Sequence, residues 1–204
     1  VNAQENTDKT LVSWITLDNL IQRGGSALTI QQGDEFDAIV FGEINSGKWM
    51  AGSNNFSRTQ KDQDSWDVED ADSHTLIQMA VVYQDEAVMI YRNGQLYASY
   101  EANNIDLLNT EYNLVVFGLR HIGAGGGSFS GAIEDARIYD RALSPEEINS
   151  LRPNEASIIK PYAWWDFEGD EIRDLTGRFA HHRIKNGSKL SGGKLVLGEK
   201  SVTV

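Results

Sequence analysis

Hydrophobic and polar residues alternate along most of the first 139 residues, and this period of two predicts β-strands. Gly, Asn, Asp and Ser bound the runs and are typical of turns. Asn93-Gly94 separates two of the runs and can adopt the positive φ angles of a type I′ turn, which indicates a β-hairpin. The pattern therefore predicts an all-β fold. The expected strands cover residues 11–17, 27–31, 36–41, 76–83, 87–91, 96–100, 114–119 and 132–139.

One stretch departs from the two-residue period. The run Ser-Pro-Glu-Glu at residues 144–147 combines an N-cap Ser, a Pro at the first helical position and a Glu at the third, which is a capping box. Ile148 and Leu151 supply one apolar turn, and Pro153 ends it. The sequence predicts a short surface helix over residues 145–151.

The charge balance narrows the class of partner. The 204 residues include 18 Lys and Arg against 30 Asp and Glu, a formal net charge of -12. An acidic domain repels polyanions, so nucleic acid is not an expected partner. No apolar run approaches the roughly 20 residues that a membrane-spanning helix needs. The sequence has no Cys, which excludes disulfides and cysteine-ligated zinc.

The first residues carry a signal of export. The chain begins Val1-Asn2-Ala3-Gln4, and Val-x-Ala before a polar stretch is typical of a small-residue signal cleavage site. We therefore expect a secreted, periplasmic or cell-surface protein. A boundary placed within a longer chain is an alternative explanation of a start without Met.

Residues 131–148 carry the most specific pattern of the sequence. They combine an acidic pair, an Arg-Ile-Tyr strand and an Arg-Ala-Leu-Ser lead into the helix. Together with residues 75–83 and 88–94, this run resembles the closing part of the concanavalin A-like, laminin-G-like jelly roll. The resemblance implies an all-β, two-sheet antiparallel sandwich with one short surface helix near residues 145–151.

The segment that normally opens this family comes last here. Residues 163–169, 174–177 and 194–204 resemble the family's opening strand, turn and edge strand. One interpretation is a single circularly permuted domain, residues 1–204, in which residues 162–204 complete a main body of residues 1–151. The alternative is a complete first domain followed by a truncated second. We favour permutation because unpaired sheet edges would otherwise remain, and because domain termini often lie close together.

Trp164-Trp165 lies within this displaced segment. Successive side chains on a strand point to opposite faces, so we expect one ring in the core. The other should cover the second sheet or pack against a neighbouring domain.

The permuted arrangement, with Trp-Trp-Asp-Phe-Glu-Gly at residues 164–169, resembles the N-terminal module of secreted bacterial family-32 glycoside hydrolases. Those enzymes cleave fructans and sucrose. The resemblance implies a C-terminal catalytic domain of the same polypeptide after residue 204. The chain itself lacks the Glu-x-Asp-x-x-Glu pattern of catalytic jelly rolls, so we expect no catalysis from it. A jelly-roll glycosidase, which would need two carboxylates about 5 Å apart, is retained as an alternative.

A ligand site is expected in the loops. Sugars stack on aromatic rings through their C–H patches, and their paired hydroxyls bind Asn, Asp and Arg. Residues 48–59, 64–67 and 120–121 supply that mixture. In the alternative interpretation, Trp49 and Phe56 fill the core and Asn54-Asn55 only makes a turn. The candidate ligand-binding residues are Trp49, Asn55, Arg58, Trp66, Arg120 and His121.

A structural calcium is implied by the resemblance. Many of these jelly rolls hold calcium near the acidic pair of the last strand, which corresponds to Glu134 and Asp135, and Asp174 of the displaced segment is a possible neighbour. Six acids within residues 62–72 also offer oxygen ligands, but their spacing does not follow the EF-hand, which favours a solvated loop.

These features together predict a non-catalytic carbohydrate-binding or accessory module of a secreted glycoside hydrolase acting on fructan-type or related glycans. The alternative is a structural domain that packs on a catalytic domain without a ligand of its own. Exposed aromatic residues on an open concave face would favour the first function, and a face plugged by side chains would favour the second.

Overall fold

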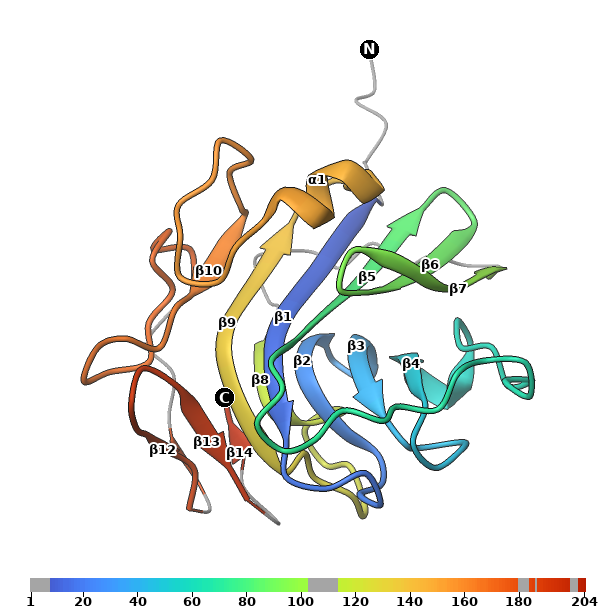
Figure 1. Cartoon of the computed structure of the whole chain (residues 1–204), viewed down its shortest axis with the longest axis horizontal. Coiled ribbons are helices and arrows are strands. Elements are labelled where there is room, and N and C mark those ends of the chain that lie inside the picture. The colour runs from blue at the N-terminus through green and yellow to red at the C-terminus, as the bar shows by residue number, and fades with distance from the viewer. Residues whose placement is uncertain (1–7, 103–113, 180–183, 186, 199–201) are drawn as a thin grey trace.

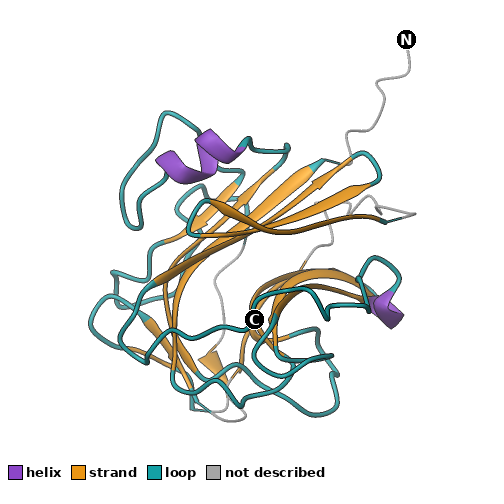
Figure 2. Ribbon diagram, turned by 45° about the vertical axis from the view of Figure 1, so that its right-hand side comes forward, coloured by secondary structure: helices purple, strands orange, loops and turns teal. Residues whose placement is uncertain are grey.

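The protein is a sandwich of two antiparallel β-sheets with one short α-helix outside it (Figures 1 and 2). The expected two-sheet all-β fold is therefore confirmed. None of the helices found in the described part of the chain is long and apolar enough to cross a membrane. The computed structural model describes residues 8–102, 114–179, 184–185, 187–198 and 202–204.

The larger sheet has eight strands. They are β1 (Lys9–Leu17), β5 (Ile77–Gln84), β6 (Ala87–Arg92), β7 (Gln95–Glu101), β9 (Gly131–Tyr139), β10 (Ala163–Trp165), β12 (Lys189–Leu190) and β13 (Leu195–Leu197). Their spatial order is β12-β13-β9-β1-β5-β6-β7, and β10 also pairs with β9. The central strand β1 pairs along most of its length with β5 and β9.

The smaller sheet has six strands. They are β2 (Gly25–Gln32), β3 (Glu35–Phe41), β4 (Trp49–Ser53), β8 (Leu114–Leu119), β11 (Ile184–Lys185) and β14 (Val202–Thr203), and the 3-10 turn η1 (Asn54–Phe56) follows β4. Their order is β11-β14-β8-β2-β3-β4, so β4 lies at one edge.

The C-terminal strands join both sheets. β10 pairs with Ala136–Ile138 of β9, β13 pairs with Gly131–Ile133 of the same strand, and β14 pairs with β8. Trp165 is fully buried in the core and Trp164 is half-buried on the other face. The expectation that the two rings point to opposite faces is confirmed.

The main core lies between the sheets and consists of the inward-facing residues of both. A second cluster covers the outer face of the larger sheet, and Ile148 is the buried residue by which α1 (Pro145–Ser150) packs onto it. The predicted capping box is confirmed, because Ser144 Oγ accepts from Glu147 N and Glu147 Oε2 accepts from Ser144 N. The helix is thereby fixed at its first turn by its own sequence.

All eight expected strands are present, with ends shifted by no more than two residues. The hairpin is also confirmed, since Asn93 and Gly94 have φ values of 51° and 74° and join β6 to β7. Three strands lie outside the expected ranges: the two-residue strands β11 and β12, and β4, which lies within the segment expected to be a loop. Gly52 interrupts its hydrophobic run because a Cβ there would lie 2.5 Å from Val40 Cγ2, so the alternation signal is lost where the sheet needs a glycine.

Candidate functional site

Residues 57–76, here called the strap, connect β4 to β5. In Figure 1 the strap runs from β4 across the front of the view and up to β5. Its backbone is held by side chains from β7 and from the residue before β4: Tyr97 Oη donates to Asp67 O at 2.6 Å, Tyr100 Oη donates to Arg58 O at 2.9 Å, and Lys48 Nζ donates to Gln63 O. A further bond joins Glu69 N to Gly47 O at 2.7 Å. The strap is therefore anchored along its length.

Glu69 is the centre of this anchoring. Its side chain is fully buried, and Oε2 accepts from Trp49 Nε1 and Arg92 Nε, both at 2.8 Å. Oε1 accepts from Arg92 Nη2 at 2.7 Å and from Ala71 N at 3.0 Å. Burial alone would raise the pKa of Glu69, but the hydrogen bonds from Arg92, Trp49 and Ala71 outweigh it and hold the pKa below its usual value. The strap is thus joined to β4 and β6 through one carboxylate.

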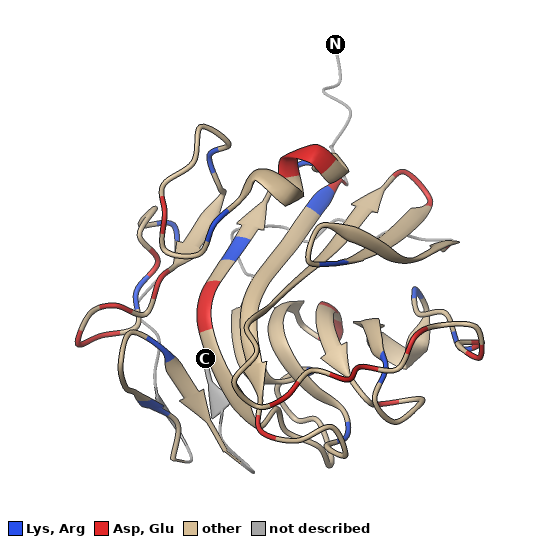
Figure 3. Ribbon diagram, in the orientation of Figure 1, with Lys and Arg blue, Asp and Glu red and all other residues tan. Residues whose placement is uncertain are grey.

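A cavity of about 320 Å³ lies between the strap and the edge of the larger sheet. We call it the strap groove, and its lining residues are Asp67, Val68, Glu69, Asp70, Arg92 and Tyr97. Figure 3 shows the acidic residues that follow one another along the strap.

The exposed groups of the strap groove have spare hydrogen-bonding capacity. Neither the Asp67 nor the Asp70 carboxylate hydrogen-bonds to another described residue, and both residues are exposed. Arg92 gives Nε and Nη2 to Glu69, which leaves Nη1 without a partner in the described structure. Burial raises the pKa of Tyr97 to about 12, so its hydroxyl stays protonated and donates to the strap. The groove therefore offers two acceptors, one cationic donor and one half-buried ring.

Trp66 supports the groove without lining it. Its ring packs edge-on against Tyr97 with centroids 5.8 Å apart, and it stacks on Tyr100 at 6.1 Å. It also contacts the core cluster on the outer face of the smaller sheet. Trp66 therefore covers the free edge of β4 and holds the ring of Tyr97 in place.

Three other predicted ligand residues lie on or near β4, and two of them are buried. Trp49 has no exposed surface and packs against Phe41, as the alternative interpretation expected. Arg58 is 1% exposed and donates from Nε to Asp37 Oδ1 at 2.9 Å. These two positions are corrected, because neither side chain can reach a ligand. Asn55 is exposed in η1, where its φ is 51°.

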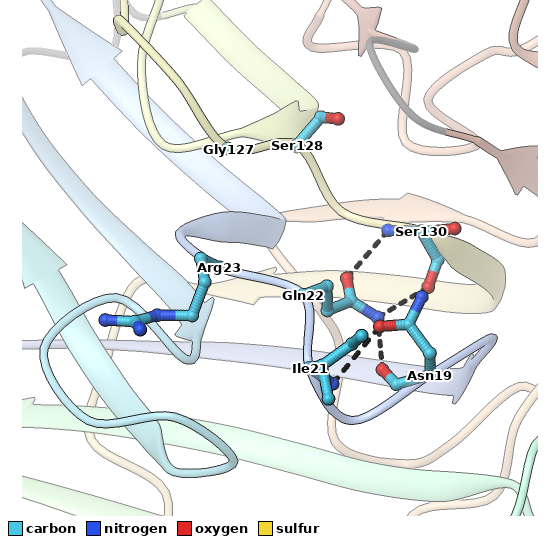
Figure 4. Close-up of a pocket in the computed structure, with 7 residues that line it drawn as sticks. All are labelled: Asn19, Ile21, Gln22, Arg23, Gly127, Ser128 and Ser130. Carbon is cyan, nitrogen blue, oxygen red and sulfur yellow. Dashed lines mark hydrogen bonds between the residues drawn. The ribbon is translucent and has the colours of Figure 1, made fainter.

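A second cavity, of about 380 Å³, lies at one end of the sandwich between the β1–β2 and β8–β9 loops (Figure 4). We call it the end pocket, and it is lined by Asn19, Ile21, Gln22, Arg23, Gly127, Ser128 and Ser130. Gln22 Nε2 donates to Ser130 O and Gln22 Oε1 accepts from Ser130 N, both at 2.8 Å. Arg23 points away from Gln22 and donates from Nη2 to Glu43 O at 2.8 Å. The polar side chains thus bind the walls of the pocket together.

Arg120 and His121 follow β8 in the β8–β9 loop and do not line the strap groove. Arg120 forms an ion pair with Glu43, and the His121 ring stacks on Phe36 with centroids 4.9 Å apart. Burial raises the pKa of Glu43 although Arg120 and His121 act against it. The structure therefore distributes the six predicted ligand residues over three places.

The residues expected to hold calcium are engaged with N–H donors. Asp135 Oδ1 accepts from Arg137 Nε at 2.9 Å, and its Oδ2 accepts from Arg137 Nη2, Asn154 N and Trp164 Nε1 at 2.7 to 2.9 Å. Burial raises the pKa of Asp135, and the hydrogen bonds and charge of Arg137 oppose that rise. The Arg137 guanidinium itself lies between the rings of Trp14 and Trp164, at 5.0 and 4.7 Å.

Asp174 and Glu134 have partners of the same kind. Asp174 accepts from the backbone N–H groups of Trp164, Thr176, Arg178 and Phe179. Glu134 pairs with Lys194 at 3.1 Å. Trp164 links Asp135 to Asp174, yet nowhere in the described ranges do three or more His, Asp or Glu side chains gather as a metal site. The arrangement does not fit calcium, because a cation would compete with Arg137 and the backbone donors for the same oxygens.

Arg92 and Tyr97 are groove residues that the sequence did not indicate. Both belong to the predicted hairpin, and their role depends on a strap that precedes them by about 25 residues. Asp67, Glu69 and Asp70 carried a signal, because they belong to the acidic run of residues 62–72.

Comparison with known proteins gives a family match over the main body. The model of a family described as the concanavalin A-like lectin/glucanases superfamily matches residues 1–149. No curated protein sequence matches the chain.

Several solved structures are similar to it. A Bacteroides ovatus protein proposed to bind carbohydrate aligns with a TM-score of 0.62 and 14% identity, over 87% of this chain and 52% of that one. Domain 4 of AbnA, an extracellular family-43 arabinanase from Geobacillus stearothermophilus in complex with arabinotriose, aligns with a TM-score of 0.55 and 18% identity, over 70% and 65%. A SAP-like pentraxin from Limulus polyphemus aligns with a TM-score of 0.50 and 16% identity, over 76% of each chain.

These likenesses establish the fold. The chain spans about half of the length of the Bacteroides ovatus protein and 65% of the arabinanase domain structure. Similarity at this level of identity carries no assignment of a ligand.

Proposed function

The chain belongs to the concanavalin A-like lectin/glucanase superfamily, and we propose that it is a non-catalytic carbohydrate-binding module whose ligand lies in the strap groove. The observation that carries this proposal is the meeting of four unsatisfied or exposed groups in one cavity. These are the ring of Tyr97, Nη1 of Arg92 and the carboxylates of Asp67 and Asp70.

The chemistry of these groups matches a saccharide. A sugar presents apolar C–H patches to an aromatic ring and vicinal hydroxyls that donate to carboxylates and accept from a guanidinium. The cavity of about 320 Å³ falls within the range typical of small-molecule sites. Its volume and its groups together suit a short stretch of an oligosaccharide.

Preorganisation supports the same proposal. The hydroxyl of Tyr97 accepts from Trp49 N at 3.3 Å and donates to Asp67 O at 2.6 Å, so it joins β4, β7 and the strap. Glu69 fixes Arg92 with two hydrogen bonds. Groups held in position before binding lose little conformational entropy when the ligand arrives.

The wider context that we propose is a module of a secreted bacterial glycoside hydrolase with a catalytic domain C-terminal to it. The likeness to domain 4 of an extracellular arabinanase supports an accessory role. The resemblance of the C-terminal motifs to family-32 enzymes makes fructans the other glycan class to test. A linked module of this kind raises the local concentration of its enzyme on a polymer.

Circular permutation belongs to this proposal. The family model ends at residue 149, whereas β10, β13 and β14 extend both sheets with later residues. Permutation accounts for both facts, because the added strands occupy edges that β8 and β9 would otherwise expose.

The test is calorimetric titration of the 204-residue chain with fructan and arabinan oligosaccharides and with other plant and bacterial glycans. Tyr97→Ala should weaken binding by about tenfold or more, because it removes the stacking ring and one strap anchor. Leu96→Ala is the matched control, since Leu96 is the adjacent residue of β7, 58% exposed, and absent from the groove lining.

Each outcome assigns a function. Binding that Tyr97→Ala weakens and Leu96→Ala does not would support the proposal. Silence across the panel, from a sample that circular dichroism shows to be folded, would overturn it in favour of a structural domain that packs on its catalytic partner.

A further inference from the structure

We propose that the strap groove selects uncharged glycans and rejects glycans that carry carboxylates, such as uronic and sialic acids. This inference rests on the proposed function and names the ligand class of the same site. It follows from the sign and the partners of the charges that line the groove.

The charges of the groove do not balance. Arg92 is its one cationic lining residue, against the acids Asp67, Glu69 and Asp70. Glu69 binds Arg92 through two hydrogen bonds of 2.7 and 2.8 Å, so this pair is neutral as a unit. Asp67 and Asp70 also line the groove, and although the charge of Arg92 acts on Asp70 as well, three carboxylates against one guanidinium leave the lining with a net negative charge.

The surroundings add charge of the same sign. The strap carries six acids within residues 62–72, with Lys61 at one end, and the whole chain has a net charge of -12. Figure 3 shows this run of acidic residues on the strap, which Arg92 and Tyr97 join to the β6–β7 hairpin through hydrogen bonds. An anionic sugar therefore meets repulsion both at a distance and at the site.

Hydrogen-bond complementarity gives the same result. A neutral sugar offers hydroxyl donors to the carboxylates of Asp67 and Asp70, whereas a sugar carboxylate can only accept. Arg92 Nη1 is the one group of the lining that could pair with it, and the charge of Arg92 already interacts with Glu69 and Asp70. Replacing a hydroxymethyl group by a carboxylate thus removes a favourable bond and adds repulsion.

The experiment compares three ligands on one scaffold. They are the neutral oligosaccharide that binds best, its derivative with primary alcohols oxidised to carboxylates, and the methyl ester of that derivative. We expect the carboxylated form to bind roughly tenfold more weakly than the neutral form at low salt. This difference in affinity should narrow as salt is raised, because salt screens the repulsion. The methyl ester should recover most of the affinity, which separates charge from size.

Two double variants locate the effect. Asp67→Asn with Asp70→Asn should shrink the gap between the neutral and carboxylated ligands severalfold. Asp62→Asn with Asp64→Asn makes the same change of charge on the same strap outside the groove lining, and should leave most of the gap in place.

The two proposals fail in different ways. Equal affinity for the neutral and carboxylated ligands, or equal narrowing in both double variants, would overturn the selectivity and keep glycan binding. An acidic glycan that binds when neutral glycans do not would also overturn the selectivity and keep glycan binding. Absence of binding to every glycan would overturn both.

Discussion

The strap groove and the end pocket are cavities of similar size, about 320 and 380 Å³, yet they differ in what their polar groups do. In the end pocket the amide of Gln22 is used by the two loops that it joins. In the groove the buried carboxylate of Glu69 makes the structural hydrogen bonds, and the exposed carboxylates of Asp67 and Asp70 remain available to accept from a ligand. The volume of a cavity is thus a poorer guide to a binding site than its spare hydrogen-bonding capacity.

Replacing Glu69 by Ala should have the largest effect on the groove. Loss of this buried acceptor leaves the Trp49 indole and the Arg92 guanidinium unpaired, so we expect the free energy of unfolding to fall by about 3 kcal/mol. Glycan binding should be lost with the position of Arg92. Urea unfolding measures the free energy of unfolding, and calorimetric titration of folded protein without urea measures the glycan affinity.

Glu134→Ala is the control for that variant. It removes an acid whose pair with Lys194 is partly exposed, and should cost less than about 1 kcal/mol. Equal stability of the two variants would contradict the central role given to Glu69.

Replacing Tyr97 by Phe should have a smaller effect. The ring is kept, but the hydroxyl no longer donates to Asp67 O or accepts from Trp49 N, so affinity should fall severalfold and stability by about 1 kcal/mol. Tyr100→Phe removes a comparable bond to Arg58 O outside the groove lining, and should lower stability to a similar extent with unchanged affinity. Loss of affinity in both variants would show that the strap responds as a whole.

Replacing Gln22 by Ala tests the end pocket. The bonds to Ser130 N and O are lost, so stability should fall by about 1–2 kcal/mol. Glycan affinity should stay within about twofold of the parent, because the groove is untouched. A marked loss of affinity in titration calorimetry would instead place the ligand at the end pocket.

Removing divalent cations should have the smallest effect. The oxygens of Asp135 and Asp174 accept from N–H donors, so EDTA should change neither the melting temperature nor the glycan affinity. A melting temperature that falls with EDTA and recovers with calcium would restore the calcium site expected at Glu134, Asp135 and Asp174.

Arg58 and Asp135 were selected from the sequence for their chemistry, but their partners in the folded chain decide what they do. Arg58 was expected to bind a sugar, and the structure pairs it with Asp37 inside the sandwich. Asp135 was expected to bind a metal, and the structure pairs it with Arg137. A buried ion pair and an exposed ligand site use the same side chains, and the local sequence around each does not distinguish them.

What the sequence determined by itself has a local physical basis. Alternation of apolar residues, the Asn93-Gly94 turn and the capping box of Ser144 and Glu147 each depend on backbone geometry within a few residues. Those signals were sufficient to predict the eight expected strands and the helix.

The tertiary structure alone decided the candidate site. Glu69 meets Trp49 and Arg92, which lie 20 and 23 residues away along the chain, because the strap folds back over the edges of both sheets. Such contacts are set by the packing of the whole sandwich, and each of their members looks like an ordinary strand or loop residue in its own segment. The sequence therefore specified the strands, and only their assembly created the groove.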